Sequence, residues 1–134
     1  MILLDTHVVL WLFKDDPRLG SKAIDVIGQD GDRRISAMVS WEIAMNIDKG
    51  RLTLEMPLEP WLRKGFESID IVEMPVTGAI ARDAGSLRDG LHGDPCDRIM
   101  IATARSLSSP LVTADEKILA YAAAGHLQAI DARR

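Results

Sequence analysis

The sequence has little of several features that would point to particular functions. It has one cysteine, Cys96, so no disulfide can form within the chain, which weakly favours a reducing compartment. No apolar run reaches the roughly 18 residues that a membrane-spanning helix needs. The net charge is −4, which gives no general attraction to nucleic acid. Three Trp, two Phe and one Tyr are too few for a broad platform that stacks RNA bases.

The start of the chain also lacks a basic segment. Met1 is followed by a short apolar run that meets Asp5 at once, so we expect no secretory signal peptide and a cytoplasmic protein. Apolar residues make up 47% of the 134 residues and charged residues 27%, as in globular proteins. We therefore expect one domain over residues 1–134.

Short apolar runs alternate with helical patterns along the chain. The expected strands are 2–4, 34–37, 69–74, 111–113 and an edge strand at 127–130. The expected helices are 8–13, 16–27, 41–48, 60–68, 77–87, 95–107 and 115–123. This alternation predicts an α/β fold with a central parallel sheet covered by helices on both faces. Ligands bind such sheets beyond the carboxyl ends of their strands.

The helix that begins at Pro95 brings two acids to one place. Proline suits the first helical position, so Asp94 is the expected cap. Asp97 follows three residues later and lies on the same face of the helix. A simpler interpretation is that both acids only stabilise the positive end of the helix.

Other acids fall at the same rim of the predicted sheet. Asp5 directly follows the first strand, and Asp115 follows the fourth. Glu42 is expected in the first turn of a helix that Ser40 caps. Each has a structural alternative, such as a strand-end turn or, for Asp115, a place beside a capping box that ends at Glu116. Their coincidence at one end of the sheet favours a single acidic site.

Such a cluster is unfavourable without a cation. Two carboxylates roughly 5 Å apart repel each other by about 3 kcal/mol at an effective dielectric constant of about 20, which would raise their pKa values. A divalent cation reverses this, and oxygen ligands without paired Cys or His favour Mg²⁺ or Mn²⁺. The reaction that fits is metal-assisted attack of water on a phosphodiester.

The motifs that carry these acids resemble those of the PIN domain, and more narrowly the VapC-type toxins of type II toxin–antitoxin systems. The matching stretches are Leu3-Leu4-Asp5-Thr6, Ser40-Trp41-Glu42-Ile43, Asp94-Pro95-Cys96-Asp97-Arg98 with the helix to Ala104, and Val112-Thr113-Ala114-Asp115. The resemblance implies a three-layer α/β/α sandwich and a Mg²⁺- or Mn²⁺-dependent endoribonuclease. It also implies a homodimer that a cognate VapB-type antitoxin holds inactive.

The resemblance also assigns roles to residues. Asp5, Glu42 and Asp97 would be the main catalytic and metal-binding acids, and Asp115 would complete the metal site. Asp94 would be an additional acid of lower rank. The hydroxyls of Thr6 and Thr113 would orient the acids or the water. Cys96 departs from the family pattern, where a bulky aromatic residue is more usual, and predicts a local packing change.

Alternatives remain at this stage. A catalytically silent PIN domain that binds RNA or a protein partner would carry the same motifs. A receiver-like signalling domain would need paired acids after the first strand, and a haloacid-type phosphatase an Asp-x-Asp there; Asp5 stands alone. We interpret His7 and His92 as structural, with substrate contact as the alternative for His7 and proton donation for His92. The candidates for phosphate contacts, with plain surface charge as the alternative, are Arg33-Arg34, Lys49 with Arg51, Arg63-Lys64, Arg82 and Arg88.

Overall fold

The computed structural model describes residues 1–88, 90–91 and 93–134 and is built on a five-stranded sheet. Its strands are β1 (Ile2–Leu4), β2 (Arg33–Ser36), β3 (Ile71–Met74), β4 (Leu111–Thr113) and β5 (Ala129–Asp131). They lie in the order β3-β2-β1-β4-β5, and every neighbouring pair is parallel. All carboxyl ends therefore meet at one edge, as predicted.

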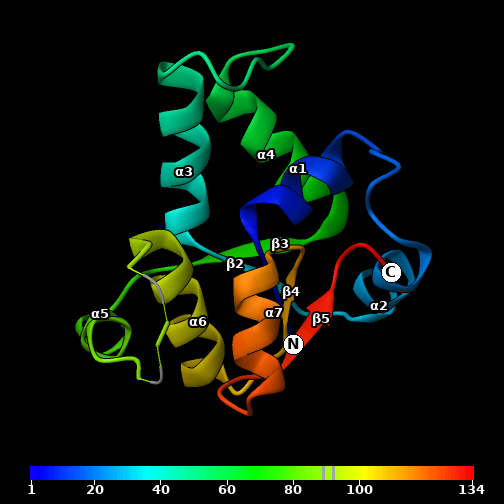
Figure 1. Cartoon of the computed structure of the whole chain (residues 1–134). Helices are drawn as coiled ribbons and strands as arrows, with labels where there is room; N and C mark the ends of the chain where they lie inside the picture. The colour runs from blue at the N-terminus through cyan, green and yellow to red at the C-terminus, as the bar shows by residue number, and fades with distance from the viewer. Residues whose placement is uncertain (89, 92) are drawn as a thin grey trace.

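Helices cover both faces of this sheet. They are α1 (Thr6–Phe13), α2 (Ser21–Gln29), α3 (Ala37–Asp48), α4 (Leu58–Ile69), α5 (Gly78–Gly85), α6 (Pro95–Leu107) and α7 (Glu116–Ala123). The chain moves outward from β1 to β3 and then crosses to β4, so right-handed connections place α5, α6 and α7 on the face opposite the earlier helices. Figure 1 shows α6 and α7 side by side, with α1, α3 and α4 grouped apart from them. The α/β/α arrangement is confirmed.

The two central strands form the middle of the core. Every residue of β1 and β4 is buried, because helices pack on both sides of them. Such strands are apolar throughout, and here the polar exception is Thr113 at the end of β4. Buried polar side chains therefore appear at the carboxyl ends of these two strands, with Thr113 as the last residue of β4 and Asp5 directly after β1. None of the helices in the described part of the chain is both long and apolar enough to cross a membrane.

Two helix starts differ from the prediction. Ser36 caps α3, and its hydroxyl accepts the N–H of Met38 at 3.0 Å, so this helix begins before Ser40. Ser40 lies inside the helix and donates to Glu73. The predicted place of Glu42 in the first turn is therefore wrong, because it lies one turn further along. The helix expected from residue 16 begins only at Ser21.

The start of α6 matches the prediction. Asp94 is the N-cap, its carboxylate accepts the N–H of Asp97 at 3.1 Å, and Pro95 is the first helical residue. Arg98 donates to the backbone carbonyls of Ala84, Leu87 and Leu91 at 2.8–3.3 Å. This side chain therefore connects the start of α6 to the end of α5 and the following loop.

Candidate active site

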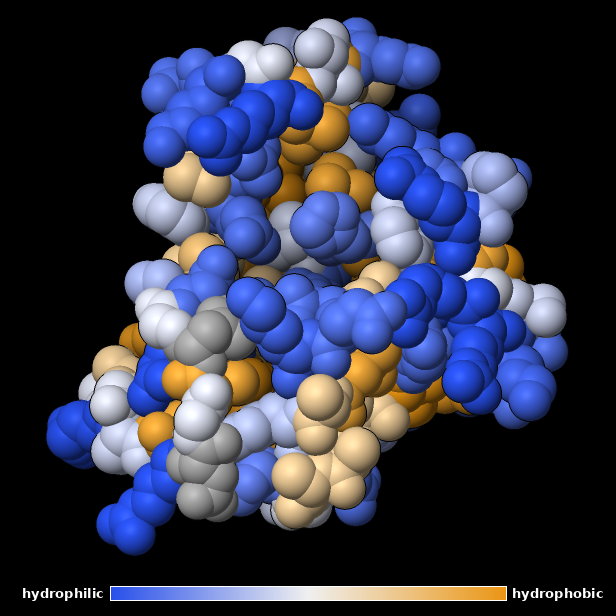
Figure 2. Space-filling view, in the orientation of Figure 1, coloured by the Kyte–Doolittle hydropathy of each residue, from blue (hydrophilic) through white to orange (hydrophobic). Residues whose placement is uncertain are grey.

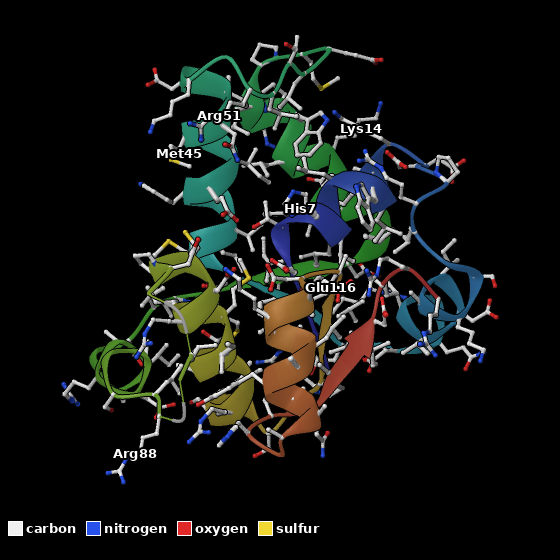
Figure 3. All side chains as sticks on the ribbon, in the orientation of Figure 1. His7, Lys14, Met45, Arg51, Arg88 and Glu116 are labelled. Atoms are coloured by element: carbon white, nitrogen blue, oxygen red, sulfur yellow. The ribbon has the colours of Figure 1, made fainter. Side chains whose placement is uncertain are left out.

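The predicted acids line one cleft of about 840 Å³ at the carboxyl edge of the sheet. Its walls comprise Asp5, His7, Trp11, Arg18, Glu42, Asp94, Asp97, Ala114, Asp115, Glu116, Lys117 and Arg133. Figure 2 shows hydrophilic side chains across the middle of this face, with apolar ones above it between α3 and α4. Figure 3 shows two of the lining residues, His7 on α1 and Glu116 on α7, near each other at the centre of the molecule. Segments far apart in the sequence thus deliver acids to one place.

Asp5 is a buried carboxylate held from two sides. It is only 5% exposed, and it caps α1 by accepting the N–H of Thr6 at 2.7 Å through Oδ1. The Thr113 hydroxyl donates to Oδ2 at 2.6 Å. Burial raises the pKa of Asp5 above its ordinary value, and these two hydrogen bonds oppose the rise. The carboxylate is therefore oriented while its charge remains costly.

Thr113 connects two of the acids. Its hydroxyl donates to Asp5 and also accepts the N–H of Asp115 at 3.0 Å. Asp115 caps α7, and its Oδ1 accepts the N–H groups of Lys117 and Ile118 at 2.9 and 3.0 Å. No described residue donates a hydrogen bond to Asp115 Oδ2. The interpretation of Asp115 as a residue beside a capping box that ends at Glu116 is therefore wrong, because Asp115 is itself the cap. One oxygen of its carboxylate remains for the cleft.

Glu42 reaches the cleft from α3. It accepts a hydrogen bond from the hydroxyl of Thr6, the residue that follows Asp5. Cys96 is buried, and its thiol lies within hydrogen-bonding reach of Glu42. Burial, with the negative charges of Glu42, Asp94 and Asp97, raises the pKa of the Cys96 thiol to about 12. The small thiol thus packs beneath the acids as a neutral group.

Asp97 shows most directly that the acids are close together. Burial raises its pKa from 3.8 to about 7, and the negative charges of Asp94, Asp115, Asp5 and Glu42 add to the rise, in that order. A carboxyl group with this pKa is half protonated near neutral pH in the metal-free protein. The repulsion expected from the sequence is therefore present in the fold.

Basic residues at the cleft were missed by the sequence reasoning. Arg18 pairs with Asp16 at 2.7 Å, and Arg133 pairs with Glu116 at 2.6 Å and Asp131 at 3.0 Å. None of these three ion pairs involves the predicted metal-binding acids. Lys117 is exposed at the cleft, and its position two residues after Asp115 was the only signal in the sequence.

None of the basic residues that were candidates for phosphate contacts is among the residues that line the cleft. Arg33 and Arg34 lie at the start of β2, at the opposite edge of the sheet. Arg33 donates to backbone carbonyls of Ile27, Gly28 and Ile69, and Arg34 pairs with Asp32 at 2.8 Å.

Of the two histidines near the acids in the sequence, the structure describes only His7. His7 is exposed and lines the cleft, so its interpretation as a packed residue is wrong. The prediction for His92 falls outside the residues that the structure describes.

Comparisons with known proteins give the family of this chain. The PIN domain family model matches residues 2–124. Ribonuclease VapC22 of Mycobacterium tuberculosis is 32% identical over 121 residues, which cover 90% of this chain and 91% of that protein.

Solved structures share the fold at low sequence identity. A chain of VapBC2 from Rickettsia felis, bound to a DNA fragment from its promoter, aligns with a TM-score of 0.71 and 18% identity, covering 97% of this chain and 98% of that one. A chain of a toxin–antitoxin complex from Klebsiella pneumoniae aligns with a TM-score of 0.67 and 19% identity, covering 98% and 97%.

Proposed function

Because this chain belongs to the PIN domain family, we propose that it is a metal-dependent endoribonuclease and the toxin of a toxin–antitoxin pair. One observation carries the proposal. Asp5, Glu42, Asp97 and Asp115, which come from separate elements, line the same cleft, where burial and then the neighbouring negative charges raise the pKa of Asp97 to about 7. The 32% sequence identity to a ribonuclease, over 90% of this chain, supports RNA as the substrate.

The donor set fits Mg²⁺ or Mn²⁺. The cleft acids offer carboxylate oxygens, and hard divalent cations prefer such ligands. Among residues 1–88, 90–91 and 93–134, no group of three or more His, Cys, Asp or Glu side chains is arranged so that it could hold a metal ion. Mg²⁺ retains several waters and binds proteins through one or two carboxylates, so direct contact with Asp5 and Asp97 would be enough.

We assign the acids as follows. Asp5 and Asp97 would hold the cation, and Glu42 and Asp115 would share it or hold its waters. Asp94 contributes negative charge while capping α6. When bound, the cation would activate water and neutralise charge on the scissile phosphate.

The chain's own hydroxyl and amide groups keep these oxygens in place. Thr113 and the Thr6 N–H fix both oxygens of Asp5, and the Thr6 hydroxyl orients Glu42. The N–H groups at the start of α7 hold one oxygen of Asp115 and leave the other directed to no described donor. Such preorganisation lowers the cost of assembling charged ligands during the reaction.

We further propose that residues 1–134 act as one PIN-like domain in the cytoplasm, as a homodimer inhibited by a cognate VapB-type antitoxin. Relatives with this fold were solved as VapBC and toxin–antitoxin complexes, which supports such a partner. Co-expression of the chain with the product of a neighbouring small gene would test it. Inhibition of the nuclease by the co-purified partner is expected.

The activity is tested by incubating purified protein with RNA in Mg²⁺, in Mn²⁺ and in EDTA. Cleavage is expected only with the metals, and Asp97→Asn should abolish it. Glu59→Gln, an exposed acid in α4, is the matched control and should cleave normally. Cleavage in EDTA would overturn the metal dependence, and RNA binding without cleavage in either metal would favour the catalytically silent alternative.

A further inference from the structure

One part of the cleft wall is formed by rings and a guanidinium. His7 and Trp11 lie one turn apart on α1, and their ring centroids are 6.2 Å apart. The Arg18 guanidinium lies over the Trp11 ring, with its Cζ 5.1 Å from the ring centroid. His7, Trp11 and Arg18, the α1 wall, all line the cleft and begin two residues from Asp5. Figure 3 shows His7 at the end of α1 that faces α7.

Arg18 is exposed yet fixed in orientation. Its side chain is 68% exposed, but Nε and Nη2 donate to the two oxygens of Asp16 at 3.1 and 2.7 Å. These hydrogen bonds lower the pKa of Asp16 to about 2, so the pair stays ionised at neutral pH. An exposed arginine normally loses rotamer entropy when it binds a ligand, and here most of that loss has already occurred. No described residue accepts a hydrogen bond from Nη1.

Arg133 is the useful contrast within the same cleft. Its Nε and Nη2 donate to Asp131, both at 3.0 Å, and its Nη1 donates to Glu116 at 2.6 Å. Each guanidinium nitrogen of Arg133 is therefore occupied by a carboxylate. Arg18 has one acidic partner, Asp16, and one face over the Trp11 ring, so its Nη1 remains available to bind an anion.

We propose that the α1 wall binds the RNA backbone beside the scissile phosphate, with Arg18 on the neighbouring phosphate and His7 against the nucleotide between them. The inference rests on the endoribonuclease function proposed above. A cation at the acids neutralises only the phosphate that it contacts, so adjoining phosphates near this acidic cleft need another positive group. A guanidinium presents hydrogen-bond donors in a geometry that matches phosphate oxygens. The stacked Trp11 ring holds that group at the cleft.

The test measures binding separately from cleavage. Variants are made in the Asp97→Asn background, and a fluorescent single-stranded RNA oligonucleotide is titrated at several salt concentrations, with its integrity checked on a gel. Arg18→Ala should weaken binding about fivefold and reduce the slope of log K against log salt by roughly 0.7, as expected for loss of one phosphate contact to a single strand. Arg18→Lys should retain the slope and lose part of the affinity. Lysine keeps the positive charge but lacks the paired N–H donors of the guanidinium and its planar contact with the Trp11 ring.

Arg88→Ala is the matched control, because it removes the same charge from an exposed residue that Figure 3 shows far from His7. It should leave affinity and slope unchanged. His7→Ala should weaken binding without changing the slope. Equal affinities and slopes for the Arg18→Ala and Arg88→Ala proteins would overturn the inference.

A second measurement separates this inference from the proposed function. With Asp97 intact, Arg18→Ala should raise KM for RNA cleavage and leave kcat nearly unchanged. If the unaltered protein cleaves no RNA with Mg²⁺ or Mn²⁺, the proposed function fails, whereas a binding defect specific to Arg18→Ala would still support the α1 wall as an RNA contact.

Discussion

The Thr113 hydroxyl should be essential for keeping Asp5 ionised. It is fully buried, donates to Asp5 Oδ2 at 2.6 Å and accepts the N–H of Asp115 at 3.0 Å. Thr113→Val preserves the shape of the side chain but removes both hydrogen bonds. A hydrogen bond to a charged group contributes about 1.5–3 kcal/mol, so we expect a loss of about 2 kcal/mol in the free energy of unfolding. For a chain of 134 residues this corresponds to a decrease of about 7 °C in Tm.

The matched control is Thr113→Ser, which keeps the hydroxyl and loses one methyl group, worth about 0.8 kcal/mol. Both variants are compared by thermal denaturation in EDTA and by titration with Mg²⁺. The valine variant should be the less stable of the two and should bind Mg²⁺ more weakly, because an unsupported Asp5 carboxylate takes up a proton more readily. Its deficit should grow with pH, since a protonated Asp5 does not need the donor. Equal Tm values and equal Mg²⁺ affinities for the two variants would refute this reasoning.

Further predictions concern the acids and the backbone. Folding raises the pKa of Asp97 from 3.8 to about 7 in the metal-free protein. Between about pH 4 and pH 7 the folded chain therefore keeps a proton that the unfolded chain has released. The contribution of Asp97 to the free energy of unfolding consequently falls as pH rises through this range. Added Mg²⁺ should consequently raise Tm more at pH 8 than at pH 6, and equal increases would contradict the assignment. Glu42→Gln should lower RNA cleavage about 100-fold or more with little change in Tm, whereas Glu59→Gln should leave the rate unchanged. Gly20→Ala should lower the free energy of unfolding by about 1–3 kcal/mol in urea titrations, because its Cβ would lie 2.1 Å from the C-terminal backbone. Gly28→Ala, which meets no atom within 4 Å, is its control and should be neutral or slightly stabilising.

The helices and strands that carry the acids could be predicted where local chemistry determines them. Pro95 can occupy only the first turn of a helix without loss of a hydrogen bond, so Asp94 had to be its cap. At α3 the sequence predicted Ser40 as the cap, but the cap is Ser36, because its position depends on where β2 ends. That end is set by pairing with β3 at Met74, a contact between distant parts of the chain.

The acidic half of the cleft was predictable for a similar reason, and the basic half was not. Parallel strands have their carboxyl ends at one edge, so residues that follow Leu4 and Thr113 must meet. Arg18 follows no strand and opens no helix. It reaches the cleft because its guanidinium stacks on Trp11 and pairs with Asp16, and neither contact leaves a periodic signal in the sequence.

The four main acids are not equivalent, and the difference explains how the fold tolerates them. Asp5, Glu42 and Asp115 each accept hydrogen bonds from hydroxyl or backbone N–H groups that fix the direction of their oxygens. For Asp97, burial and the neighbouring acids all raise the pKa. The metal-free protein therefore relieves part of its repulsion by protonating Asp97 on α6, while the other three carboxyl groups stay oriented. Metal binding near neutral pH is then coupled to proton release at Asp97.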